Sequence, residues 1–242
     1  MKFIGGSYSD IGNYREVNQD AICMRTYSYK DNDMALGAIF DGVGGLYKSE
    51  QASQAAANGF EVLFIHLCEL IDQGLEEFDI LLSHIEDAMD DWNYEVHELN
   101  QAQGERSGTT ASVLFCLNDK YGIRHVGDSR VYMYSENLLT KLTVDDSVEK
   151  EVDGIKRKFL VNCIGKGEDL DFSSSDGVIK PGTLFFYGSD GFYHCTIEED
   201  VRGFVKSFVS GEKPDEICKN AVKEVLSRGE SDNVSVGMIY CT

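Results

Sequence analysis

Residues 34–42 carry the sequence MALGAIFDG, in which a short apolar run ends directly at the dipeptide Asp41-Gly42. A run of this length, bounded by a turn signal, predicts a buried strand. Similar runs rich in β-branched or aromatic residues predict further strands at 2–9, 21–27, 109–117, 120–126, 130–134, 138–142, 183–188 and 234–240. The predicted strands therefore follow one another in consecutive groups.

Helical patterns separate these groups. Apolar or small residues recur at helical spacing from about 49 to 70 and from about 77 to 103. In the second segment a helix packed on the core is favoured over a coiled coil, because the pattern lasts barely three heptads. Residues 196–199 have a capping-box pattern that would open a helix to about Ser210, and Pro214 and Gly229 would begin and end another.

The order of these elements indicates the fold class. One helical pair follows the third strand and a second pair precedes the last strand, which predicts an α+β fold with antiparallel sheets and helices packed outside. The chain has two prolines and no Gly/Ser/Pro-rich linker, so we expect one domain over residues 1–242.

The charge balance excludes some classes of partner. The chain has 42 Asp and Glu against 22 Lys and Arg, a net charge of -20. We therefore expect no nucleic-acid partner and no binding to an anionic membrane surface. The N-terminus lacks the apolar core of a secretory signal, and no run is long enough to span a membrane. The seven cysteines include no CxxC pair, which favours reduced thiols in a cytoplasmic protein.

Four predicted strands begin or end at an aspartate, namely Asp41, Asp128, Asp190 and Asp232. A tight turn explains any one of them. If all four lie at one end of a sandwich, however, their carboxylates repel one another unless a cation lies between them. Oxygen ligands without a His/Cys cluster select Mg²⁺ or Mn²⁺. The sequence therefore predicts a carboxylate-metal site.

Patterns typical of other sites are absent from the sequence. The segment that begins at Asp31 lacks the glycine that a calcium-binding EF-hand loop requires, and there is no P-loop, GxGxxG or GxSxG motif. One early cation remains of interest, because the fork of Arg15 could complement a phosphate dianion near Asp20. The alternative is that Arg15 is an ordinary surface residue.

These residues lie in motifs that occur together in one known family. The motifs are GNYREVNQDA at 12–21, FDGVGG at 40–45, SGTTASVLF at 107–115, HVGDSRVYMY at 125–134, LTVDDS at 142–147, GSDGF at 188–192 and SDNVSV at 231–236. Because these motifs occur in the same order as in the family, the chain resembles the metal-dependent serine/threonine protein phosphatases of the PPM, or type 2C, family, in its bacterial branch. The resemblance runs from about Gly12 to Ile239.

The resemblance implies a four-layer α-β-β-α sandwich with two Mg²⁺ or Mn²⁺ ions at one end. It places metal ligands at Asp41, Asp190 and Asp232 and at the carbonyl of Gly42, and a third, weaker ion at Asp128 with Asp190. It also implies that Asp20 lies at the same centre, mostly through water, in a catalytic role. Arg15 would bind the substrate phosphate.

The chain departs from the family pattern at several positions. Val43 stands where many eukaryotic members carry a histidine proposed as general acid, and Gln19 replaces a frequent acid. His194 replaces a usual aspartate, which makes it either a loop residue or a changed ligand for the third ion. Asp146 replaces the histidine of a DHS motif. The segment 147–159, which corresponds to the flap, is short.

We therefore expect a phosphatase that hydrolyses phosphoserine and phosphothreonine on proteins and opposes a Ser/Thr kinase. Two alternatives remain open at this point. One is a pseudophosphatase that keeps the fold as a regulatory binding module. The other is a signalling phosphatase dedicated to a single partner protein, which the short flap would suit.

Overall fold

Two antiparallel sheets form the centre of the computed structural model, which describes residues 1–152, 155–167 and 170–242. In the described residues one sheet has the strand order β1-β12-β11-β6-β7, built from Phe3–Asp10, Val234–Cys241, Leu184–Gly188, Arg130–Ser135 and Leu138–Lys141. The other has the order β10-β5-β4-β3-β2, built from Ser173–Val178, Lys120–Val126, Ala111–Leu117, Asn32–Asp41 and Asp20–Tyr29. A separate hairpin pairs β8, Ser147–Val152, with β9, Ile155–Leu160.

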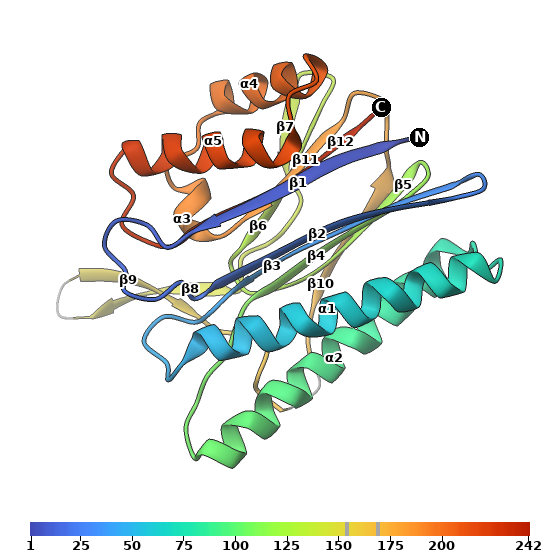
Figure 1. Cartoon of the computed structure of the whole chain (residues 1–242). Helices are drawn as coiled ribbons and strands as arrows, with labels where there is room; N and C mark the ends of the chain where they lie inside the picture. The colour runs from blue at the N-terminus through green and yellow to red at the C-terminus, as the bar shows by residue number, and fades with distance from the viewer. Residues whose placement is uncertain (153–154, 168–169) are drawn as a thin grey trace.

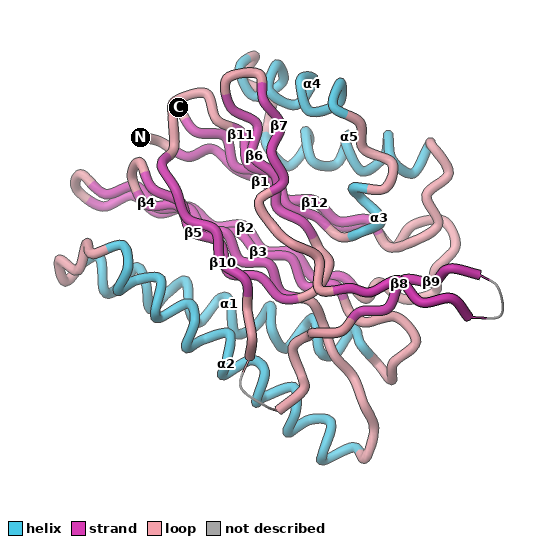
Figure 2. Tube along the Cα trace, turned by 180° about the vertical axis from the view of Figure 1, so that it is seen from behind, coloured by secondary structure: helices cyan, strands magenta, loops and turns pink. Residues whose placement is uncertain are grey.

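Helices cover the outer faces of both sheets (Figure 1). The long helices α1, Ser49–Asp72, and α2, Phe78–Gln103, lie on the β2–β3–β4–β5 side, and α4, Glu198–Val209, and α5, Pro214–Ser227, lie on the other. The short helix α3, Asp190–Tyr193, follows β11. The predicted four-layer α-β-β-α sandwich is confirmed. The β8–β9 hairpin projects from one end of these layers (Figure 2).

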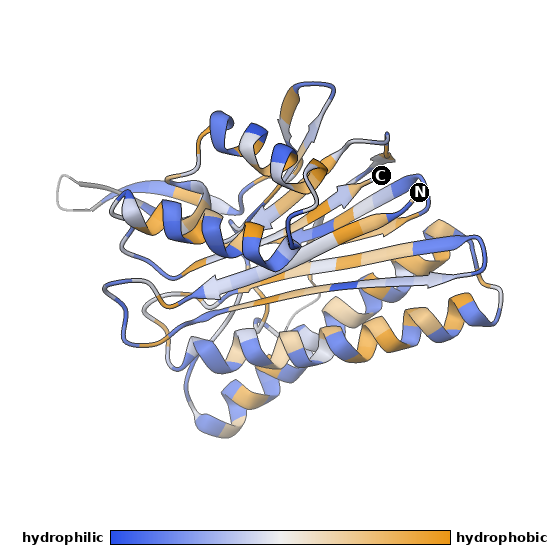
Figure 3. Ribbon diagram, turned by 45° about the horizontal axis from the view of Figure 1, so that its top comes forward, coloured by the Kyte–Doolittle hydropathy of each residue, from blue (hydrophilic) through white to orange (hydrophobic). Residues whose placement is uncertain are grey.

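Three apolar layers hold the sandwich together. Phe40, Phe60 and Trp92 lie in the layer between α1, α2 and their sheet, and the rings of Phe40 and Trp92 meet edge to face at 5.5 Å. A second layer lies under α4 and α5, and a third fills the space between the two sheets. The long helices alternate hydrophobic and hydrophilic residues, as their burial on one face requires (Figure 3).

Tyr187 joins the two sheets through this third layer. It is fully buried on β11, and its hydroxyl donates a 2.7 Å hydrogen bond to the carbonyl of Cys23 on β2. Gly37 on β3 and Gly237 on β12 both lie against its ring, so closely that a side-chain methyl at either position would clash with it. Gly37 lies within the segment MALGAIFDG, and its lack of a side chain is therefore what admits the ring.

The fold differs from the sequence-based expectations in four places, one of which is the short helix α3 that follows β11. Strand β10 was not predicted, because the Ser-Ser-Ser-Asp-Gly-Val segment is polar and forms a half-exposed edge strand beside β5. The hairpin β8–β9 was likewise not predicted. The predicted cap at Thr196 is wrong: its hydroxyl donates to the carbonyl of Phe192, and the carboxylate of Asp200 accepts the Ile197 N–H at the start of α4.

The other helix limits are close to the prediction, including the proline start of α5 and the positive φ of Gly229 after its end. Within the described residues, none of the helices combines the length and the apolar character that a membrane crossing requires.

Candidate active site

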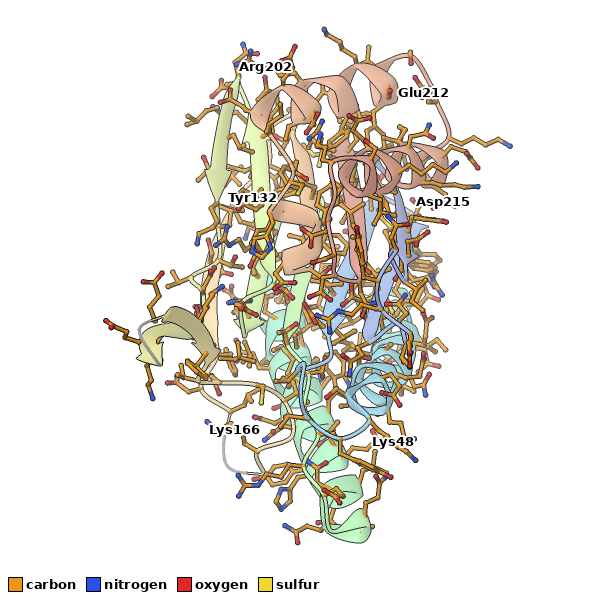
Figure 4. All side chains as sticks on the ribbon, turned by 90° about the vertical axis from the view of Figure 1, so that its left-hand side faces the viewer. Lys48, Tyr132, Lys166, Arg202, Glu212 and Asp215 are labelled. Carbon is orange, nitrogen blue, oxygen red and sulfur yellow. The ribbon has the colours of Figure 1, made fainter. Side chains whose placement is uncertain are left out.

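Four of the predicted aspartates border one cavity at the end of the sandwich from which the hairpin projects. The cavity has a volume of about 430 Å³. Its lining consists of Arg15, Gln19, Asp41, Gly42, Val43, Gly44, Thr110, Asp128, Lys158, Phe159, Leu160, Asp190, Asp232 and Asn233. Figure 4 views the molecule from this end, with Tyr132 above the hairpin and Lys166 below it. The structure thus brings together residues that are almost 220 positions apart in the chain.

Asp20 and Asp41 face each other as register partners in neighbouring strands, Asp20 at the start of β2 and Asp41 at the end of β3. One oxygen of Asp20, Oδ2, accepts hydrogen bonds from the hydroxyls of Ser189, at 2.8 Å, and Ser235, at 2.7 Å. Both serines belong to the opposite sheet region, next to β11 and on β12. The carboxylate of Asp20, which belongs to one sheet, is therefore held in place by hydrogen bonds from residues of the other sheet.

The backbone around Asp41 is equally constrained. Its N–H donates to Thr110 Oγ1 at 3.0 Å, and its carbonyl accepts the Thr110 N–H at 2.8 Å. The N–H of Gly42 donates to the carbonyl of Gln19 at 3.0 Å. A side-chain carbon at Gly42 would lie 2.8 Å from the carbonyl oxygens of Gln19 and Ser49, so only glycine fits there.

The carboxylates of the cavity disfavour one another's charge. Burial, and then the charges of four neighbouring carboxylates, raise the pKa of Asp41 well above its usual range. Burial also raises the pKa of Asp20 to about 6, although the hydrogen bonds from Ser235 and Ser189 oppose the shift. Burial and the charge of Asp232 raise the pKa of Asp190. The cluster therefore carries negative charge that its surroundings do not balance.

Two basic side chains pair with the cluster in the described part of the chain. Arg15 donates to Asp232 Oδ2 at 2.6 Å, and Lys158 lies 3.0 Å from Asp128 Oδ2. Arg15 is therefore at the predicted site and is not an unrelated surface residue. Lys158 was not a candidate in the sequence, because a lysine in a charged segment is typical of a solvated surface.

Asn233 was also missed, although it supports the loop that carries Arg15. Its side chain is buried, accepts the Gln19 N–H at 2.9 Å and donates to the carbonyls of Ile11 at 2.9 Å and Val17 at 3.1 Å. The only sequence signal was its position next to Asp232. Ser189 had a clearer signal, since it directly precedes the strand-end Asp190, whereas Ser235 lies three positions after Asp232.

The positions that depart from the family pattern lie near the site in different ways. Val43 and Gly44 line the cavity, so no imidazole occupies that position. His194 is exposed at the end of α3, where its N–H donates to the carbonyl of Asp190. Asp146 lies outside the cavity lining, and its carboxylate accepts the Gly127 N–H at 3.0 Å next to Asp128.

The donor set suits a hard divalent cation. The described lining residues include four carboxylates and no histidine or cysteine. Burial and then the neighbouring carboxylates raise the pKa of Asp41, and a divalent ion would offset both effects by neutralising the charge. In this structure no three of the described Asp, Glu, His or Cys side chains already enclose one point. Asp20, Asp128 and Asp232 are instead bonded to the serines, Lys158 and Arg15. Mg²⁺ and Mn²⁺ fit these ligands.

Comparison with known proteins places this architecture among solved phosphatases. The serine/threonine phosphatase of S. agalactiae superposes with a TM-score of 0.78 at 20% identity, covering 99% of this chain and 100% of that one. The catalytic domain of the serine/threonine phosphatase PstP, in complex with two manganese ions, superposes with a TM-score of 0.73 at 21% identity, covering 98% and 97%. The fold is thus that of bacterial serine/threonine phosphatases.

Sequence comparison gives the family. Protein phosphatase PhpP of Streptococcus pneumoniae serotype 2 is 20% identical over 245 residues, covering 96% of this chain and 94% of its own length. The family model described as Protein phosphatase 2C matches residues 5–153, more than half of the chain. The chain therefore belongs to the protein phosphatase 2C family, a family of serine/threonine protein phosphatases. The predicted resemblance is confirmed.

Proposed function

We propose that the chain hydrolyses phosphoserine and phosphothreonine on proteins with the help of Mg²⁺ or Mn²⁺, and that residues 1–242 act as one catalytic domain. The observation that carries this proposal is the convergence of four aspartates and Arg15 on one cavity. The family and the manganese-bound structure of PstP support the choice of metal. The partners are phosphorylated proteins in the cytoplasm and, indirectly, the Ser/Thr kinase whose action the enzyme reverses.

The proposed metal ligands are the carboxylates of Asp41, Asp190 and Asp232 and the carbonyl of Gly42. Asp128, which is paired with Lys158 in the structure, is the candidate ligand of a third ion. When bound, two such ions supply an activated water and neutralise charge on the leaving oxygen. The hydrogen bonds of the Asp41 backbone and the tight fit of Gly42 hold this part of the main chain in place before any substrate arrives. Ligation by Asp232 then requires its carboxylate to release Arg15.

The chain's own residues orient the substrate and the water. Arg15 can turn its guanidinium from Asp232 to the phosphate and donate two parallel hydrogen bonds to the phosphate oxygens. Asp20, held through Oδ2 by both serine hydroxyls, can accept a hydrogen bond from the water through Oδ1. Phe159 and Leu160 of the hairpin give the cavity an apolar wall. Because Val43 replaces a histidine, we propose that a water protonates the leaving group.

The decisive test compares two aspartates at opposite ends of one strand. Asp41→Asn should abolish Mn²⁺-dependent hydrolysis of p-nitrophenyl phosphate and of a phosphothreonine peptide. Asp33→Asn, near the other end of β3 where Asp33 pairs with Lys2, should keep the activity even if it lowers stability. No turnover by the wild-type protein with any divalent metal, or full turnover by Asp41→Asn, would refute the proposal and favour a pseudophosphatase.

The choice of substrate needs a separate experiment. A comparison of phosphoproteomes with and without the protein should show phosphoserine and phosphothreonine sites that rise in its absence. A rise confined to one phosphoprotein would identify a dedicated signalling phosphatase, whereas a broad rise would identify a general antagonist of a kinase.

A further inference from the structure

Lys158 connects the projecting hairpin to the acidic cavity. It lies on β9, and its ammonium group is 3.0 Å from Asp128 Oδ2 and 3.2 Å from Asp145 Oδ2. The side chains of Asp128 and Asp145 are only 19% and 14% exposed. Lys158 also lines the cavity that contains Asp41. A residue of the hairpin thus supplies a positive charge inside the carboxylate cluster.

The charge of Asp145 is balanced without Lys158. Arg130 donates to both of its oxygens, at 3.0 and 2.8 Å, and Lys141 lies 3.1 Å from Oδ1. Although burial opposes the shift, these hydrogen bonds hold the pKa of Asp145 below its usual range. Asp145 therefore serves to position Lys158, and the charge of Lys158 is available to Asp128.

Asp128 has no other basic partner within the described residues. Its carbonyl accepts a 3.0 Å hydrogen bond from the hydroxyl of Tyr193, and the guanidinium of Arg130 lies 3.9 Å from the centre of the Tyr193 ring. The backbone of Asp128 is thereby fixed next to the Arg130–Asp145 pair. Its carboxylate can be neutralised either by Lys158 or by a divalent ion, since both need the same oxygens.

We propose that Lys158 is an internal cation of the active site that limits the number of divalent ions the carboxylate cluster binds and holds β9 against the cavity. This inference rests on the proposed function. The carboxylate cluster consists of Asp20, Asp41, Asp128, Asp190 and Asp232. Among the residues that the structure describes, it therefore has three more carboxylates than its two basic partners, Arg15 and Lys158. Two divalent ions neutralise that excess, and a further ion cannot ligate Asp128 while Lys158 is paired with the same carboxylate.

The chain offers a matched control for this proposal. Lys141 is 38% exposed, as Lys158 is, and it contacts Asp145 from β7, yet it does not contact Asp128. We therefore compare Lys158→Met with Lys141→Met, and use Lys158→Arg as the variant that keeps the charge. All three replace a partly exposed side chain, so none should prevent folding.

The first measurement counts bound Mn²⁺ by native mass spectrometry and calorimetry. We expect the wild-type protein, Lys141→Met and Lys158→Arg to bind two ions and Lys158→Met to bind a third. An equal, non-zero count in the wild-type protein and Lys158→Met would overturn the inference and leave the proposed function intact. A count of zero in every protein would instead contradict the proposed function.

The second measurement needs no metal and decides the role of Lys158 in every case. In metal-free protein, Lys158→Met should accelerate amide hydrogen exchange in β8 and β9 by about two- to fivefold, the effect of losing a partly exposed ion pair. Lys141→Met should leave the exchange of this hairpin near the wild-type rate. Equal exchange in the two variants would overturn the proposal that Lys158 holds β9 against the cavity.

Discussion

Asn233→Ala tests how the chain positions Arg15. The amide of Asn233 makes three hydrogen bonds to the backbone of residues 11–19, and its side chain is buried. Removing it leaves one N–H and two carbonyls without these partners. Each net hydrogen bond contributes about 0.5–1.5 kcal/mol, so we expect a loss of about 2–4 kcal/mol in the free energy of unfolding. In a chain of this length that corresponds to a fall in Tm of about 5–15 °C.

The effect on activity should be larger than stability alone explains. The released loop no longer holds Arg15 beside the cavity, and a charge-assisted hydrogen bond to phosphate contributes about 1.5–3 kcal/mol. We therefore expect kcat/KM for a phosphothreonine peptide to fall about 10- to 100-fold at a temperature where the variant is fully folded. The assays are urea denaturation and steady-state kinetics with saturating Mn²⁺.

Asn32→Ala is the matched control for this prediction. Asn32 is also a buried asparagine, but it lies at the opposite end of β3 from Asp41, where it bonds Asn118 and Glu76. Its loss should lower Tm and leave kcat/KM of the folded protein unchanged. If both variants lose activity equally, or if Asn233→Ala is as stable as the wild-type protein, the proposed link between Asn233 and Arg15 is incorrect.

Three further outcomes are expected. Arg15→Ala should lower kcat/KM for phosphopeptides about 10- to 100-fold with an unchanged Mn²⁺ count, and Arg15→Lys should restore only part of it because an ammonium lacks the guanidinium fork; full activity of either variant would contradict the role. Gly42→Ala should destabilise the protein by about 1–3 kcal/mol in denaturant titrations, since backbone oxygens must move; an unchanged midpoint would contradict this close contact. Burial lowers the pKa of His125, so the folded protein keeps it neutral while the unfolded chain protonates it below about pH 6.5. His125 alone should therefore remove up to about 2 kcal/mol of stability from pH 7 to 5, whereas the raised pKa of Asp20 acts in the opposite direction. The stability difference between the wild-type protein and His125→Asn should change by up to that amount over this range; parallel curves for the two proteins would refute the assignment.

The hydrogen bonds of His125 agree with the neutral form. Its Nε2 lies 3.1 Å from the carbonyl of Val144, which can only accept, so Nε2 carries the proton. Its Nδ1 then accepts from the hydroxyl of Ser112 at 2.8 Å. Protonation of Nδ1 would require the Ser112 hydroxyl to turn from donor to acceptor.

The sequence predicted the helices and most of the strands because strand and helix periodicity is a property of neighbouring residues. An aspartate that follows an apolar run marks the end of a strand, so Asp41, Asp128 and Asp190 could be assigned to strand ends. Their gathering at one end of a four-layer sandwich was implied by the family resemblance and not by these local patterns. Strand β10 lacks such a pattern, because it is paired through its backbone while its side chains alternate toward solvent.

The supporting residues of the site could not be predicted in this way. Lys158 acts on Asp128 across 30 positions, and Asn233 acts on Val17 across 216. Their side chains are ordinary in type, and they meet their partners only because the fold brings the β8–β9 hairpin and the loops after β1 and β5 to the same end of the molecule. Long-range polar contacts of this kind depend on the completed fold.

The contact between Tyr187 and the two glycines limits which substitutions between the sheets the enzyme can tolerate. Asp20 and Asp41 belong to one sheet, whereas Asp190 and Asp232 flank strands of the other. A shift of one sheet along the other by a single residue, about 3.3 Å, would separate the two halves of the site. The ring of Tyr187, enclosed by Gly37 and Gly237, resists such sliding. Substitutions deep between the sheets should therefore impair catalysis through misalignment, even when the protein remains folded and every ligand is present.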